Sequence, residues 1–85
     1  MYTITKVVNE IGSMKPVVTA SVNDLTSIED AKELAEYIAN YFAKRHNVSY
    51  TYFESNDEEK YVCAYLVTKA DRTDIVIFIE KNENS

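Results

Sequence analysis

The stretch from Ile28 to Arg45 constrains the fold most, because its apolar side chains recur at the spacing of an amphipathic α-helix. Those apolar positions are 28, 31, 34, 35, 38, 39, 41 and 42. Thr26 or Ser27 can cap the first free amides, and the basic residues at positions 44–46 complement the negative end of the helix dipole. The sequence therefore predicts one helix over residues 28–45 with a single broad apolar stripe.

The segments on both sides of this helix are typical of β-strands, because they are rich in β-branched and aromatic residues and are bounded by polar turns. The predicted strands cover residues 2–8, 17–22, 48–54, 59–68 and 74–81. A longer loop that holds Gly12 and Pro16 separates the first two strands, and short polar segments join the last three. Short connections make neighbouring strands antiparallel, since a parallel return needs a crossover of about a dozen residues.

These elements predict an α+β fold of order ββαβββ, in which one amphipathic helix packs on one face of a single antiparallel sheet. The 85 residues are too few for two domains, so we expect one domain over residues 1–81 and a disordered tail over residues 82–85. The single cysteine excludes a disulfide framework, and with the single histidine it excludes a structural zinc site within one chain. No cofactor is expected.

The sequence also lacks the usual signals for a membrane. No apolar run approaches the ~18 residues that a membrane span needs, and the first residues lack the layout of a signal peptide. We therefore expect a cytoplasmic protein, located in the host cytoplasm if a phage encodes the chain.

A lone helix covers only one face of a sheet, so the other face is expected to remain open. In the strand over 59–68, Val62, Ala64 and Leu66 form a purely apolar side, which we assign to the helix. The residues then expected together on the uncovered face are Tyr50, Tyr52, Tyr61 and Tyr65. Tyrosine is enriched at protein interfaces because it combines apolar area with a hydroxyl. This face can bind a partner, close on a second copy as a homodimer, or simply half-cover a solvated sheet.

Acidic residues outnumber basic ones by 14 to 9, which gives a net charge of −5. Such a field repels phosphate and disfavours direct binding to nucleic acid. The acidic residues expected to enter a basic groove on a partner protein are Glu29, Asp30, Glu33, Glu36, Asp57, Glu58 and Glu59. The first four lie on the polar face of the predicted helix, and the last three form an acidic turn. Solvation of an ordinary soluble surface explains the same residues.

The residues needed for catalysis are largely missing from the sequence. There is no glycine-rich phosphate loop, no histidine pair and no paired-cysteine motif. Cys63 lies mid-strand, where a packed thiol is expected, and His46 closes the helix without an oriented partner. We therefore expect a protein that is not an enzyme.

Aromatic side chains on a sheet are also typical of single-stranded RNA readers. Such surfaces need flanking lysine and arginine, whereas these strands carry Glu54, Glu59 and only Lys60. RNA binding therefore ranks below the two protein-binding hypotheses.

The layout resembles that of several small acidic inhibitor proteins encoded by phages. A hairpin, the helix opening Leu25-Thr26-Ser27-Ile28-Glu29-Asp30-Ala31-Lys32 and a three-strand meander follow one another, and this order is similar to some anti-CRISPR proteins and uracil-DNA glycosylase inhibitors. The similarity covers most of the chain as layout alone, so it transfers no functional residue. It implies a non-catalytic inhibitor whose carboxylates occupy the nucleic-acid groove of a nucleic-acid-handling enzyme.

Overall fold

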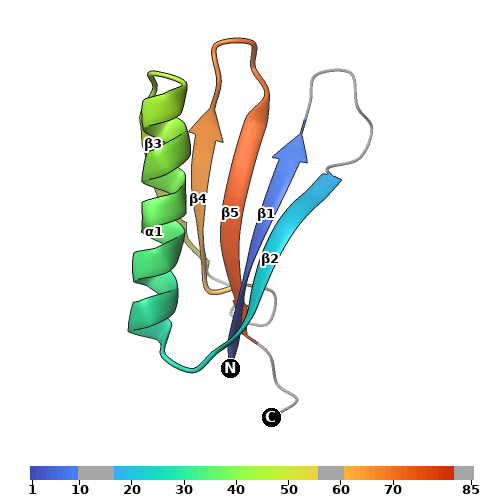
Figure 1. The fold of residues 1–85 in the computed structure, drawn as a ribbon, viewed down its shortest axis with the longest axis vertical. Helices are drawn as coiled ribbons and strands as arrows, with labels where there is room; N and C mark the ends of the chain where they lie inside the picture. Colours follow the sequence, from blue (N-terminus) through green and yellow to red (C-terminus); the bar gives the residue numbers. More distant parts are fainter. Residues whose placement is uncertain (10–16, 56–60, 82–85) are drawn as a thin grey trace.

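The computed structural model describes residues 1–9, 17–55 and 61–81, which form one antiparallel five-stranded sheet and one α-helix (Figure 1). The elements run in the order β1 (Tyr2–Asn9), β2 (Val17–Leu25), α1 (Ile28–Arg45), β3 (Tyr50–Glu54), β4 (Cys63–Thr68) and β5 (Asp74–Lys81). The predicted α+β class and the order ββαβββ are confirmed. The tail predicted over residues 82–85 lies outside the described residues.

The helix begins and ends where the sequence predicts. The Ser27 side chain accepts a hydrogen bond from the Asp30 amide at 3.3 Å, which satisfies one of the free amides of the first turn. At the other end, the chain turns through Asn47 with a positive φ of 56°. The Val48 amide then donates to the Ala43 carbonyl at 2.9 Å. Because this turn uses residues 46–48, β3 starts two residues later than predicted.

The strand order in the sheet is β2-β1-β5-β4-β3, so the last strand lies at the centre. β5 pairs with β1 on one side and with β4 on the other. A central strand needs apolar residues on both faces, which explains why Ile75, Ile77 and Ile79 alternate with Val76 and Phe78. At the edge, β2 pairs with β1 through two register shifts, and Asp24 takes a positive φ of 64° beside one of them.

The helix covers the opposite face of β4 from the one that the sequence suggested. Cys63, Tyr65 and Val67 pair in register with Ile79, Ile77 and Ile75, and all six are buried together with α1. The expectation that Val62, Ala64 and Leu66 share the helix side is therefore wrong for Ala64 and Leu66, although Val62 still packs against the core. The isoleucine row of β5 selects the face, because its neighbours across the ladder must point the same way.

Tyr65 and Tyr50 consequently lie under the helix and not on the uncovered face. Tyr65 is only 4% exposed, and its hydroxyl donates to the Lys32 carbonyl at 3.4 Å. The Tyr50 hydroxyl donates to the Glu36 carboxylate at 2.7 Å. Burial of the ring raises the pKa of Tyr65 to about 12, so its hydroxyl remains protonated as a donor at neutral pH. The phenol groups of both tyrosines therefore find hydrogen-bond partners along the helix.

The helix makes room for these rings by presenting alanine to the sheet. The fully or almost fully buried residues of α1 are Ala31, Ala35, Ala39 and Ala43, one per turn. A row of methyl groups lets the helix backbone approach the strands closely, and the aromatic and isoleucine side chains of the sheet fill the space between them. The larger apolar residues of α1, Leu34, Ile38 and Phe42, are only partly buried and lie beside this row.

This packing predicts that the alanine row does not accept a larger side chain. Ala35→Leu should destabilise the protein by about 1–3 kcal/mol, because extra methylene groups in a filled core force neighbouring side chains out of their preferred rotamers. Urea unfolding followed by circular dichroism measures the change. Asn40→Leu, at an exposed position of the same helix, is the matched control and should shift the transition little. Equal urea midpoints of unfolding for the two variants would contradict the close packing of the alanine row.

The buried thiol gives a second test of the face assignment. Cys63 is 0% exposed, and burial raises the pKa of its thiol. Because the thiolate is the reactive form, labelling of the native protein at pH 8 by a disulfide reagent should be far slower than labelling in denaturant. Rapid labelling of the folded protein would show that Cys63 points away from the helix.

Candidate functional site

A helix about 10 Å wide cannot cover five strands, because the strands lie about 4.8 Å apart and together span about 19 Å. α1 packs mainly against β4 and β5 and only weakly against β2. In Figure 1, α1 lies at the β3–β4 side, whereas β1 and β2 extend beyond it. The helix-bearing side of the sheet is therefore itself only partly covered. We call the space between α1 and strands β1 and β2 the lateral groove.

Apolar side chains line the middle of the lateral groove. Its floor is formed by β1 and β2, and its wall by the flank of α1 next to the alanine row. The lining residues are Ile4, Lys6, Ala20, Ser21, Val22, Ile38 and Phe42, around a cavity of about 150 Å³. Ile4 is buried in the core, whereas Val22 remains 38% exposed. The groove thus joins the core to solvent along the helix.

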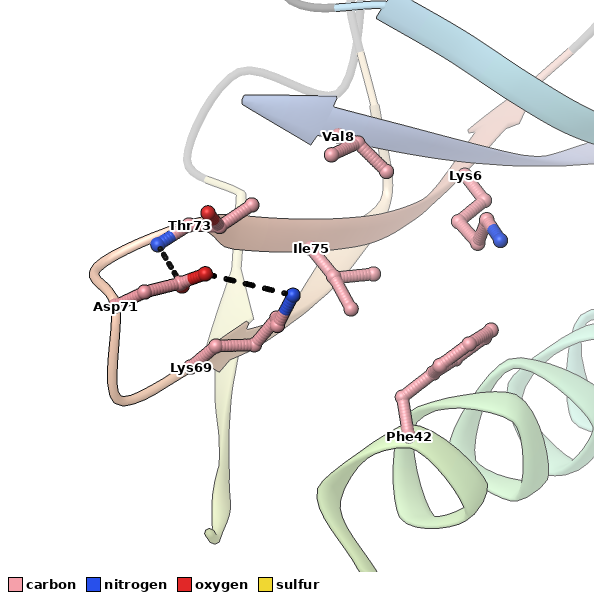
Figure 2. Close-up of a pocket in the computed structure, with 7 residues that line it drawn as sticks. All are labelled: Lys6, Val8, Phe42, Lys69, Asp71, Thr73 and Ile75. Carbon is pink, nitrogen blue, oxygen red and sulfur yellow. Dashed lines mark hydrogen bonds and ion pairs between the residues drawn. The ribbon is translucent and has the colours of Figure 1, made fainter. Parts of the chain in front are cut away.

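A larger cavity of about 430 Å³ continues the lateral groove towards the turn between β4 and β5 (Figure 2). Its walls come from β1, α1 and that turn, and Phe42 and Lys6 line both cavities. The Lys6 ammonium lies 4.4 Å from the centroid of the Phe42 ring, a cation–π contact across the groove. This contact connects the helix to β1 at the point where the two cavities meet.

The turn at the end of this cavity is ordered by Asp71. Its carboxylate accepts a hydrogen bond from the Thr73 amide at 2.9 Å and lies 3.7 Å from the Lys69 ammonium. The backbone hydrogen bond from Thr73 is the main reason that the pKa of Asp71 is lowered. Lys69 is thereby held beside the groove as a positive group.

Exposed aromatic and aliphatic side chains continue the apolar surface beyond the groove. Tyr37 is 70% exposed and Tyr41 is 50% exposed on α1, and Val17 is 58% exposed on β2. The Tyr41 ring packs edge-on against Phe42 with centroids 5.2 Å apart, and its hydroxyl accepts a hydrogen bond from Arg45 at 3.1 Å. An apolar surface therefore extends from the floor of the groove up the side of the helix.

The opposite face of the sheet is divided into an apolar and a polar half. Within the described residues, no helix or strand packs on this face. Its apolar half lies over β3, β4 and β5 and includes Phe53, Tyr61, Ala64, Leu66, Val76 and Phe78. The polar half lies over β1, where Thr5 donates to Glu80 at 3.0 Å and Thr3 to Asn23 at 3.3 Å. This face is less open than expected, because Ala64 and Thr5 are buried by their neighbours.

The four tyrosines expected on the uncovered face do not share one surface there, because Tyr50, Tyr52 and Tyr65 lie together on the helix side. Tyr61 lies on the uncovered face with Val76 and Phe78, as predicted. Tyr50 and Tyr65 lie on the helix side, as described above. Tyr52 stands beside Tyr65 with ring centroids 5.1 Å apart, at the edge of the sheet, and is 39% exposed. The predicted patch of four tyrosines does not exist as one surface.

The acidic residues of the helix lie where they were expected. Glu29, Asp30 and Glu33 are exposed on the solvent side of α1, and Glu36 accepts the hydrogen bond from Tyr50. The pKa of Glu29 is lowered, mainly by a backbone hydrogen bond and next by the Ser27 hydroxyl. The acidic turn that carries Asp57, Glu58 and Glu59 lies outside the described residues.

The described part of the chain offers little to hold a metal ion. Among residues 1–9, 17–55 and 61–81, no group of three or more histidine, cysteine, aspartate or glutamate side chains gathers. His46 forms the C-cap of α1, and its backbone amide donates to the Phe42 carbonyl. The Cys63 thiol is buried in the core, and the backbone of His46 caps the helix.

The lateral groove is the feature that the sequence interpretation missed. Treating all apolar positions of residues 28–45 as one buried stripe merged two parallel rows, the alanines and the larger residues Leu34, Ile38 and Phe42. Each row repeats every four residues. A row of small residues beside a row of large ones indicates that the helix contacts the sheet through the small residues. The large residues then lie on the flank of the helix.

Comparisons with known proteins give no relative for this chain, since no family model, curated protein or solved structure matches it. In the ranges that the structure describes, no helix has both the length and the apolarity of a membrane span.

Proposed function

We propose that the chain is a non-catalytic protein-binding module that receives a protein partner in the lateral groove. The observation that carries this proposal is the apolar flank of α1, where Ile38 and Phe42 line a cavity over β1 and β2. Tyrosine and other aromatic residues are enriched at the centre of protein interfaces. Tyr37 and Tyr41 have exposed rings of this kind.

The lateral groove supports binding better than the uncovered face of the sheet does. On that face Ala64 and Thr5 are buried and the polar half is already hydrogen-bonded, although Phe53 remains 46% exposed. In the groove, in contrast, exposed apolar side chains come from both the helix and β2. Filling the groove would remove apolar surface from water on two walls at once. Such burial contributes a favourable free energy of roughly 25 cal/mol per Å².

The proposal predicts that a charge in the groove abolishes binding. Ile38→Glu should lose the partner that wild-type protein retains from a lysate of cells that naturally contain the chain, because a buried unpaired carboxylate is costly. Affinity capture followed by mass spectrometry measures the loss. Val18→Glu is the matched control, because Val18 is 63% exposed and pairs with Val7, on the side away from α1.

Circular dichroism would first establish that both variants fold. Retention of the same protein by the wild type and Val18→Glu, and its loss in Ile38→Glu, supports the groove. Equal retention by all three proteins would contradict it.

We propose as a second candidate that the acidic face of α1 contacts a basic partner, such as the nucleic-acid groove of an enzyme. The exposed carboxylates Glu29, Asp30 and Glu33 in the first half of the helix support this function, together with the net charge of −5. Opposite surface charges of this kind accelerate association and select partners. The module would then act as an inhibitor that occupies the groove in place of phosphates.

This second candidate has a distinct salt dependence. Capture through the acidic face should weaken strongly between about 50 and 500 mM NaCl, because the screening length shortens over that range. The neutral variant Glu29→Gln/Asp30→Asn/Glu33→Gln should already bind weakly at the lower concentration. Capture that is unchanged by both salt and neutralisation would rule out a charge-based contact.

A further inference from the structure

Six side chains form a stripe along one side of α1. Asp30, Leu34, Tyr37, Ile38, Tyr41 and Arg45 are spaced 4, 7, 8, 11 and 15 residues from the first, so all six share one flank of the helix. Asp30, Tyr37, Tyr41 and Arg45 are exposed, and Leu34 and Ile38 are partly buried. We call this set the α1 stripe. It has a negative end, an apolar middle and a positive end.

We propose that the α1 stripe binds a second copy of this chain, with the two α1 helices side by side and antiparallel across a twofold axis. This inference goes beyond the proposed function of the lateral groove, because the stripe shares only Ile38 with the residues that line the groove. A twofold interface requires a surface that is complementary to itself when reversed. The α1 stripe meets this requirement.

The antiparallel register pairs every member of the stripe with a suitable neighbour. Asp30 faces Arg45 of the second copy, Leu34 faces Tyr41 of the second copy, and Tyr37 faces Ile38 of the second copy. The twofold axis repeats each of these pairs, so opposite charges meet at both ends and apolar side chains meet in the middle. A parallel arrangement would instead place Asp30 beside its own copy and Arg45 beside its own copy, which charge repulsion disfavours.

The edge strand β2 offers a weaker route to self-association. β2 carries two register shifts and a residue with positive φ, and such bulges disrupt pairing with another strand. The Arg45 guanidinium, in contrast, is held along the stripe by its hydrogen bond to the Tyr41 hydroxyl at 3.1 Å. The charged end of the stripe is therefore already oriented.

A charge swap tests the antiparallel register directly. Sedimentation equilibrium of the wild type should give a dimer, and Asp30→Arg or Arg45→Asp alone should weaken it roughly tenfold, since each replaces attractive pairs with repulsive ones. The double variant Asp30→Arg/Arg45→Asp should restore the wild-type dissociation constant. Two single variants that leave the mass unchanged, or a double variant weaker than both, would overturn the register.

Cross-linking gives an independent measurement. Tyr37→Cys lies beside the proposed axis, so a short bis-maleimide should join two copies efficiently at low protein concentration. Asn40→Cys is the matched control on the same helix, because Asn40 is exposed but lies outside the stripe. The native thiol of Cys63 is fully buried and should not react. Equal cross-linking of both variants would contradict the antiparallel contact.

The proposals about the lateral groove and the α1 stripe fail in different ways. A wild type that stays monomeric up to about 0.5 mM, well above the micromolar range of specific interfaces, overturns the second copy as the partner of the stripe. If Ile38→Glu still abolishes capture of another protein in that case, the groove remains a protein-binding surface. If the wild type is monomeric and capture does not depend on Ile38, both proposals are wrong.

Discussion

The alanine row of α1 packs in one buried cluster with the isoleucine row of β5 and the ring of Tyr65, and this contact determines the position of the other elements. Because alanine has the smallest apolar side chain, the helix lies close to the strands, and the bulk of the core comes from the sheet. The face that α1 covers is therefore the face with the larger side chains. In an interior packed to crystal-like density, exchange of the two faces would leave voids on one side and overlaps on the other.

The close approach of the helix has a cost for the rest of the fold. A helix that contacts the sheet through small residues must place its large apolar residues elsewhere, and here Leu34, Ile38 and Phe42 lie on its flank. These side chains partly cover the floor of β1 but do not reach across β2, which is exposed along nearly its whole length. The lateral groove is thus a consequence of how α1 packs, and the exposed tyrosines of the helix extend it.

The order of elements was predictable because it depends on local signals. Helical spacing, the cap at Ser27 and the short polar connections are all readable within a few residues. The face of the sheet that α1 covers was not predictable in the same way, because Tyr65 and Leu66, which point to opposite faces of β4, are both suitable for burial. That choice depends on the register with Ile77 across the ladder, and the sequence does not specify which strands are neighbours. The position of β5 between β1 and β4 depends on pairings between segments that are far apart in the chain. The sequence interpretation lacked these pairings and therefore placed Tyr50 and Tyr65 on the wrong face.

The central position of β5 also has a consequence for the synthesis of this protein. β1 pairs only with β2 and β5 among the described strands, so the N-terminal hairpin has no attachment to the rest of the sheet until the segment Asp74–Lys81 has left the ribosome. Contacts between residues so far apart in the chain form slowly, since the ends of a long loop must first meet. During elongation, the hairpin and the unit of α1, β3 and β4 are therefore joined only through the contacts of α1 with β1 and β2, and they expose apolar surface until β5 fills the gap between β1 and β4.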